Sequence, residues 1–206
     1  MADLTLKEYD KKIHEIYLKD NVNVEMWQLL VDKISEIRSS DDEVEQNNKD
    51  VLTKFGVDED LFWQLNKVPD VNIYLSTFGG EIYNMFGIYD EIKRLDQEYN
   101  VNIYCVGKVM SAGTIIMLAV PLKQRFAYKN TSIMYHTLSS YGLEGKIPEI
   151  QESVDEAKRL HKMMMNIYKE ETKLPKEKLN EVYNCKKDWY ITPEQAIKYG
   201  VISKIV

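Results

Sequence analysis

The fold is decided by the stretch from Val101 to Ala119, which reads VNIYCVGKVMSAGTIIMLA. Val101–Val106 is an apolar run with the length and composition of a buried strand. Gly107–Gly113 supplies small residues that permit a tight turn, and Thr114–Ala119 continues as an apolar helix. The stretch therefore predicts a strand that leads through a turn directly into a helix.

The same order of elements occurs just upstream. Val71–Leu75 predicts a strand, and Ser76–Gly80 predicts a glycine turn after it. Apolar residues then recur at helical spacing, namely Ile82, Met85, Phe86, Tyr89 and Ile92. Two consecutive strand-turn-helix units predict an α/β fold with parallel strands and right-handed connections.

The chain before this region predicts one more strand-helix unit and an insertion. His14–Leu18 has the pattern of a short strand, and an amphipathic helix is expected after Asn23. Residues 39–66 are acidic and polar, and the spacing of Ser40 and Glu43 matches a capping box. We therefore expect a helical acidic insertion at the surface over residues 39–66.

Beyond the central units, short strands are expected at Phe126–Tyr128 and Ser132–Tyr135, and His136 follows the second strand directly. Residues 147–172 form one long and highly charged stretch with a narrow apolar stripe at helical spacing. This pattern predicts a long helix that projects from the body and meets a partner subunit.

The carboxyl-terminal end has clear helix boundaries. Thr192 is a good N-cap residue, Pro193 suits the first helical position, and Gly200 suits the helix end. A last strand is expected at Val201–Val206. Because no linker rich in Pro, Gly or Ser interrupts the sequence, we expect its 206 residues to form a single domain.

Composition argues against several classes of protein. The net charge of -6, without a basic cluster, disfavours binding to nucleic acid. Apolar runs such as Thr114–Pro121 are much shorter than the roughly 20 residues that span a membrane. Met1–Lys7 lacks the pattern of a secretory signal, so a cytoplasmic protein is expected. Neither Cys105 nor Cys185 has metal-site spacing, and we expect neither a metal nor a cofactor.

The two glycine turns are the places where chemistry is expected. Both follow neighbouring parallel strands at their carboxyl ends, where open α/β sheets position their sites. Backbone N–H groups at such turns can stabilise a negative oxygen, which suits an oxyanion hole or a phosphate site. Neither turn matches GxxxxGK[ST] or GxGxxG, so the sequence carries no nucleotide-binding fingerprint.

Ser111 lies at the apex of the second turn, where a serine can be a nucleophile or a simple N-cap. The nucleophilic reading gains weight because His136, one of three histidines, closes a strand downstream. Hydrolysis by a serine hydroxyl also needs an acid that orients the imidazole. Spacing alone leaves both readings open.

Four segments resemble motifs of the ClpP family of serine peptidases. Gly107–Gly113 resembles the nucleophile turn G-x-x-A-S-M-G, with Ser111 in the serine position. Asn130–His136 is similar to the histidine segment P-N-S-x-x-M-I-H. Asp188–Ala196 resembles the ending D-R-x-x-S-A-x-E-A, and Ser76–Gly80 resembles the loop N-S-P-G-G. All four occur in the family's order within residues 71–206.

The resemblance implies a serine endopeptidase that hydrolyses polypeptides through a catalytic triad. Ser111 would attack the peptide carbonyl, His136 would transfer the proton, and Asp188 would orient the imidazole. The backbone N–H groups of Gly79 and Ala112 would form the oxyanion hole. The implied fold is the ClpP and crotonase type, in which β-β-α units with parallel strands repeat in a superhelix.

The resemblance also implies partners. Family members form homo-oligomers of heptameric rings, often two rings joined through a handle helix, which residues 147–172 would supply here. A separate AAA+ unfoldase would deliver folded substrates. Three departures concern specificity and assembly. Phe78 replaces the proline of the glycine loop, Thr137–Ser140 replaces Q-P-x-G-G after the histidine, and Lys187 replaces an arginine associated with contacts between rings.

Two other functions remain open at the level of sequence. One is a catalytically silent ring subunit that acts as a scaffold for an active paralogue. The other is an acyl-CoA-binding enzyme of the crotonase type, which uses the same kind of oxyanion hole. That chemistry needs a carboxylate near the glycine turns, where Glu81 is the candidate.

Overall fold

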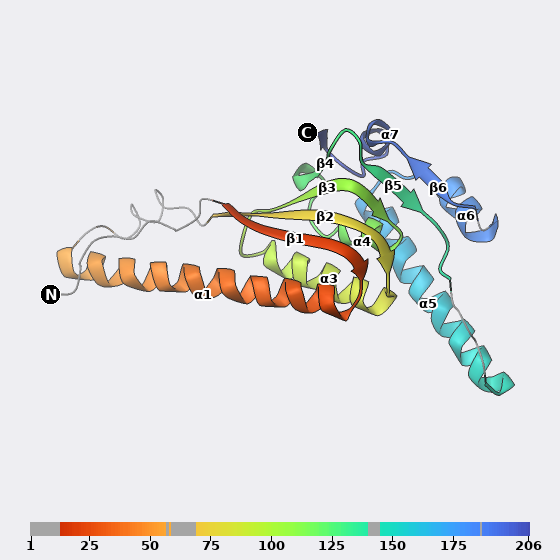
Figure 1. The fold of residues 1–206 in the computed structure, drawn as a ribbon, viewed down its shortest axis with the longest axis horizontal. Helices are drawn as coiled ribbons and strands as arrows, with labels where there is room; N and C mark the ends of the chain where they lie inside the picture. Colours follow the sequence, from red (N-terminus) through yellow and green to blue (C-terminus); the bar gives the residue numbers. More distant parts are fainter. Residues whose placement is uncertain (1–12, 57, 59–68, 140–144, 186) are drawn as a thin grey trace.

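The computed structural model describes residues 13–56, 58, 69–139, 145–185 and 187–206 (Figure 1). The elements in chain order are β1 (Ile13–Val22), α1 (Val24–Phe55), β2 (Asp70–Gly80), α3 (Ile82–Leu95), β3 (Val101–Met110), α4 (Ala112–Ile116), a 3-10 turn η1 (Leu122–Gln124), β4 (Arg125–Ala127), β5 (Ser132–Tyr135), α5 (Ile147–Glu171), α6 (Lys176–Cys185), β6 (Trp189–Ile191), α7 (Pro193–Lys198) and β7 (Lys204–Ile205).

A mostly parallel sheet forms the centre of the protein, which confirms the predicted α/β class. Its main path runs β1-β2-β3-β4-β7, and each neighbouring pair on this path is parallel. Strand β3 divides its pairing, because Ile103–Cys105 pairs with β4 and Lys108–Met110 pairs with β5. Strand β6 pairs antiparallel to β5. The turn that carries Ser111 therefore follows a strand that is paired on both sides.

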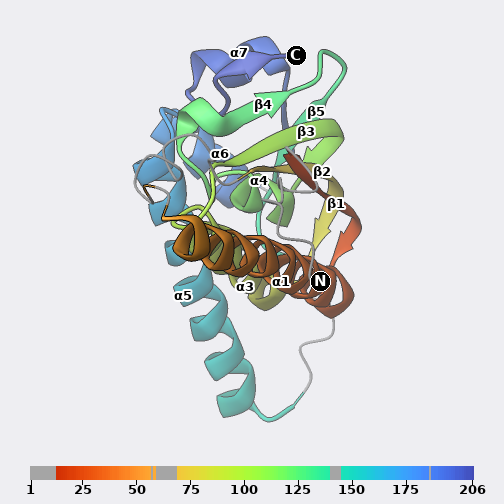
Figure 2. The ribbon, with the colours of Figure 1, turned by 90° about the vertical axis from the view of Figure 1, so that its left-hand side faces the viewer.

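The two faces of the sheet differ in character. Helices α1 and α3 lie along one face (Figures 1 and 2), where alternate strand residues such as Leu18, Ile73 and Ile103 are buried. Four aromatic rings stack across the other face, and all are directly paired in the strand register: Tyr17, Tyr74, Tyr104 and Phe126, with ring centroids 4.9 to 5.3 Å apart. Such cross-strand aromatic pairs stabilise the register of the sheet.

The central strands extend further than their sequence pattern predicts. Strand β2 continues through the glycine turn to Gly80, and β3 continues to Met110. In β3 the extension is possible because Gly107 adopts a φ of 67° and lets the strand kink. At the carboxyl terminus the predicted strand is reduced to Lys204–Ile205. Helix α6 and strand β6 have no counterpart in the sequence-based assignment.

Helix α1 is continuous from Val24 to Phe55, so residues 39–55 belong to it rather than to a separate element. Asn23 is the N-cap, and its side chain accepts a hydrogen bond from the Met26 N–H. The capping-box interpretation of Ser40 is wrong, because no helix begins there. With neither Pro nor Gly in its interior, the helix has no reason to break. The remainder of the predicted insertion falls largely outside the described residues.

Helix α5 projects away from the sheet, as the charged pattern of residues 147–172 predicts (Figures 1 and 2). Only Leu160, Met164 and Tyr168 of this helix are buried, and all three belong to its carboxyl-terminal half. The free end of the helix therefore has little contact with the body.

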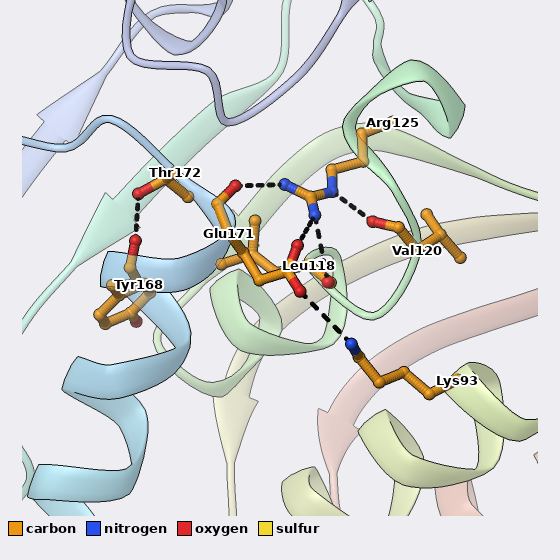
Figure 3. Close-up of polar contacts among 7 residues, drawn as sticks. All are labelled: Lys93, Leu118, Val120, Arg125, Tyr168, Glu171 and Thr172. Carbon is orange, nitrogen blue, oxygen red and sulfur yellow. Dashed lines mark hydrogen bonds and ion pairs between the residues drawn. The ribbon is translucent and has the colours of Figure 1, made fainter.

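Arg125 anchors the carboxyl-terminal end of α5 to the sheet (Figure 3). Its side chain is 1% exposed and donates hydrogen bonds to the carbonyls of Leu118, Val120 and Glu171, at 3.3, 2.6 and 2.8 Å. It also forms an ion pair with the Glu171 carboxylate at 2.5 Å. Lys93 approaches the other oxygen of that carboxylate at 3.3 Å. Burial lowers the pKa of the Arg125 guanidinium, and the Glu171 charge opposes this effect.

The described residues contain neither a candidate membrane span nor a candidate metal site. No helix there has the length and apolar character needed to cross a membrane. Within the same residues, no group of three or more His, Cys, Asp or Glu side chains could hold a metal ion.

Cys105 lies in the core, where burial raises the pKa of its thiol to about 12, so this cysteine is an inert apolar residue.

Candidate active site

Ser111 occupies a strained turn between β3 and α4. Its backbone has φ 52° and ψ -122°, a conformation that costs a non-glycine residue of the order of 1–3 kcal/mol. The Ser111 N–H donates to the Met134 carbonyl of β5 at 2.9 Å, so the neighbouring strand holds the turn in place. A strained turn from strand to helix makes a serine hydroxyl project from the end of a sheet, as nucleophiles require.

A short chain of hydroxyl groups connects this turn to helix α5. Thr114 donates to the Ser111 carbonyl through its N–H at 2.9 Å and through Oγ1 at 2.6 Å. Since the Thr114 hydroxyl hydrogen is used there, the Tyr168 hydroxyl of α5 donates to Thr114 Oγ1 at 2.7 Å. Burial raises the pKa of Tyr168, which therefore remains a protonated donor. Hydrogen bonds thus connect the Ser111 turn to the carboxyl-terminal part of the projecting helix.

His136 lies beside Ser111, and the two side chains are in hydrogen-bond contact. The distance from His136 Nε2 to Ser111 Oγ is 2.6 Å. If the serine hydroxyl donates, Nε2 carries no proton and Nδ1 does, which is the tautomer that a general base needs. Both residues are half-buried. The fold therefore brings together two of the three side chains that the resemblance implies.

Asp188 is close to this pair in the strand register but does not contact it. Strands β5 and β6 pair Tyr135 with Trp189, so the next step of the antiparallel register places Asp188 opposite His136. The Asp188 residue is exposed, and within the described part of the chain no hydrogen bond or ion pair joins it to His136. The acid is thus placed across from the imidazole without orienting it in this conformation.

The glycine loop, Ser76–Gly80, packs directly against Ser111. Gly79 has a φ of 105°, and a Cβ atom added there would lie 2.5 Å from Ser111 Cβ and 3.0 Å from Ser111 Oγ. A Cβ atom at Gly80 would lie 2.1 Å from the Val22 carbonyl oxygen. Only glycine fits these two positions, both for its backbone conformation and for the space available.

The two backbone N–H groups implied in oxyanion binding, those of Gly79 and Ala112, differ in their hydrogen bonding. Ala112 is the first residue of α4, a position whose N–H has no partner within the helix. The Gly79 N–H instead donates to Thr77 Oγ1 at 2.9 Å. Sequence reasoning missed Thr77, because a threonine in a glycine loop gives no signal of what its hydroxyl binds. It missed Thr114 and Tyr168 for the same reason, since their contact spans 54 residues.

A groove of about 900 Å³ includes Thr137, the residue that follows His136, in its lining. It is bounded by the start of α3, the residues after β5 and the middle of α5, and its lining includes Ile82, Leu138, Ala157, Leu160 and Tyr183. A groove of this size with several apolar walls can accept an extended segment of polypeptide or a comparable ligand.

One hydrogen bond connects the two sides of this groove. The Tyr83 hydroxyl of α3 donates to Glu156 Oε1 of α5 at 2.8 Å, and Arg159 binds the same carboxylate with both Nε and Nη2 at 2.7 Å. These hydrogen bonds, with Arg159 the largest contributor, lower the pKa of Glu156 to about 2. The carboxylate is therefore ionised at neutral pH.

Comparison with known proteins gives a consistent assignment. The sequence profile of the Clp protease family matches residues 44–206. An ATP-dependent Clp protease proteolytic subunit of Deinococcus radiodurans is 32% identical over 141 residues, which cover 68% of this chain and 67% of the relative. Proteolytic subunit 2 of Chlamydia muridarum is 34% identical over 137 residues, which cover 66% of this chain and 65% of the relative.

The three-dimensional comparison extends over nearly the whole chain. A ClpP1 point mutant from Listeria monocytogenes superimposes with a TM-score of 0.68 at 19% identity, and the match covers 94% of this chain and 91% of the other. At that identity the likeness concerns the fold. The profile match covers well over half of the chain, and it includes the strained serine and its histidine. On these grounds the chain belongs to the Clp protease family.

Proposed function

We propose that this protein is the serine endopeptidase subunit of a Clp-type proteolytic chamber, with Ser111, His136 and Asp188 as its catalytic triad. The observation that carries the proposal is the 2.6 Å contact between His136 Nε2 and the hydroxyl of a serine in a strained turn. A base within hydrogen-bond reach is what a serine hydroxyl needs to become a nucleophile. Family membership supports the same chemistry.

In the proposed reaction Ser111 Oγ attacks the carbonyl carbon of a peptide bond while its proton passes to His136 Nε2. The carbonyl oxygen becomes an oxyanion that accepts hydrogen bonds from the N–H groups of Gly79 and Ala112. His136 then gives the proton to the leaving amine. A water molecule hydrolyses the acyl-enzyme through the same steps, and Asp188 stabilises the imidazolium in both halves.

The proposal extends by analogy to assembly. Helix α5 projects with an exposed, charged surface and would supply the contact between subunits. We propose heptameric rings of this chain, with a second ring added through α5, and delivery of folded substrates by a separate AAA+ unfoldase. Lys187 stands where an arginine supports ring contacts in the family, and lysine lacks the bidentate guanidinium. Single rings are therefore the first state to look for, by measuring the oligomeric mass.

Active-site labelling tests the proposed chemistry. A fluorophosphonate should modify the protein at one residue, and peptide mapping by mass spectrometry should place the label on Ser111. The Ser111→Ala variant is the matched control and should remain unlabelled at the same oligomeric mass. A wild-type protein that is folded and assembled, yet takes up no label on Ser111, would refute the proposal.

A Gly79→Ala variant should lose at least about 100-fold in kcat/KM, the scale of one lost oxyanion donor. The added Cβ cannot fit beside Ser111 and must displace either the loop or the nucleophile. Gly56→Ala is the matched control, because Gly56 has a φ of 64° and open space around its missing Cβ. Hydrolysis of a fluorogenic peptide measures both variants. Equal activities would show that the glycine loop takes no part in the reaction.

A catalytically silent subunit is the second candidate. Two observations favour it: Asp188 does not contact His136, and the Gly79 N–H is already bonded to Thr77. Such a subunit would act as a scaffold in a ring with an active paralogue. Copurification with a second proteolytic subunit, together with failure to label Ser111, is the result that distinguishes this function from the first.

A further inference from the structure

The amide that the proposed reaction needs is already occupied in this structure. The Gly79 N–H donates to Thr77 Oγ1 at 2.9 Å, and both residues are buried. A hydroxyl oxygen that accepts from the N–H two residues later is a local turn contact of threonine. The Gly79 N–H has a single hydrogen, so Thr77 and an oxyanion above Ser111 would compete for it.

The Thr77 hydroxyl is itself held from the other side. Its hydrogen is donated to the Asp20 carbonyl of β1, where the β1 and β2 register shifts and Asp20 adopts a φ of 74°. With its one hydrogen used there, Oγ1 is left as an acceptor for Gly79. A Cβ atom added at Gly113 would lie 2.5 Å from the Thr77 methyl group, so this methyl group also packs against the turn that carries Ser111.

We infer that Thr77 is a positioning residue that holds the Gly79 N–H in the resting protein and yields it to the oxyanion during catalysis. The inference rests on the proposed function. A buried amide needs a partner in every state, and Thr77 supplies it when no substrate is present. The developing oxyanion is the stronger acceptor, because a hydrogen bond to a charged group is roughly twice as strong as a neutral one.

This exchange of hydrogen-bond partners determines how the Thr77 hydroxyl affects stability and kcat/KM. Its bond stabilises the free protein and is broken in the transition state, so it raises the barrier relative to free protein and substrate. Removing the hydroxyl should therefore lower stability and raise kcat/KM together. Substitution of a residue that only supports the fold would lower both stability and kcat/KM.

The test compares Thr77→Val with Thr77→Ser. Valine keeps a methyl group over Gly113 and removes the hydroxyl, whereas serine keeps the hydroxyl and removes the methyl group. We expect the kcat/KM of the valine variant to exceed that of the serine variant by about 2- to 10-fold, the range for one neutral hydrogen bond. The rate of Ser111 labelling by a fluorophosphonate should change in the same direction.

Thr131→Val provides a matched control for the loss of a buried hydroxyl. Thr131 is 3% exposed and donates to the Cys105 carbonyl at 2.8 Å, away from the proposed reacting atoms. Its replacement should lower the melting temperature without raising kcat/KM. A folded Thr77→Val variant whose kcat/KM equals or falls below that of Thr77→Ser would overturn the role of Thr77.

A second measurement needs no variant. In a crystal structure of the wild-type protein with a peptide boronate on Ser111, we expect the Gly79 N to lie about 3 Å from a boronate oxygen. Its contact with Thr77 should then exceed hydrogen-bond range. A retained bond to Thr77, with the boronate oxygen bound elsewhere, would overturn the inference. A folded wild-type protein that neither takes up the label on Ser111 nor cleaves peptides would instead refute the proposed function.

Discussion

An Asp188→Asn variant is expected to lose about 10⁴-fold in kcat while it retains its fold and oligomeric mass. In the extended β5-β6 register Asp188 lies opposite His136, so a change of side-chain conformation can bring its carboxylate to the imidazole. There it would accept the Nδ1 proton and stabilise the imidazolium. An asparagine can present an N–H instead, which favours the wrong tautomer and cannot balance the positive charge.

The matched control for this prediction is Glu181→Gln. Glu181 lines the same small pocket as Asp188, and it forms an exposed ion pair with Lys178. Its replacement removes one negative charge from the same surface but leaves the register with His136 intact. Hydrolysis of a fluorogenic peptide gives kcat for both variants. If the two variants keep similar activity, Asp188 is not the third member of a triad.

The free energy of unfolding of an Arg125→Met variant is expected to be about 3 kcal/mol lower than that of the wild type. This value is the lower end of the range for breaking a buried ion pair. Methionine fills similar volume, but three carbonyl groups lose their donor and the Glu171 carboxylate loses its closest cation. The lower end applies because Glu171 is 24% exposed and keeps Lys93 as a neighbour. The carboxyl-terminal end of α5 should open first (Figure 3).

Arg38→Met is the matched control for Arg125→Met. Arg38 also binds a glutamate with two nitrogens, but its side chain is 30% exposed and that of Glu98 is 45% exposed. Exposed pairs of this kind contribute about 1 kcal/mol or less. Urea denaturation at one fixed protein concentration measures both variants, since assembly shifts the apparent stability. Equal losses would mean that the buried position of Arg125 has no special importance.

Much of the fold was predictable because it depends on local patterns. The glycine segments at the ends of β2 and β3, the helix that begins after Asn23, the Thr192 cap and the charged helix α5 are all encoded within a few neighbouring residues. The lengths of β2 and β3 were not predictable, because a strand ends where its partners stop offering hydrogen bonds. Strand β6 was missed because three residues carry too little periodicity.

The candidate site was predictable to the extent that motifs name residue types. Ser111 and His136 were identified from a turn, a strand end and a family resemblance, and the fold brings them into contact. The conformation of Asp188 and the partner of the Gly79 N–H were not accessible in this way. Both depend on where a side chain rotates after the strands have paired, which neighbouring residues do not specify.

The sequence by itself determined the α/β class, the positions of the turns and the pairing of a serine with a histidine as candidates. Those features follow from local conformational preferences and from the hydrophobic pattern. Tertiary structure alone decided that Arg125 is buried on the end of α5 and that Thr77 binds the Gly79 amide. The physical reason is that a buried polar group must find its partner wherever packing places one, regardless of distance along the chain.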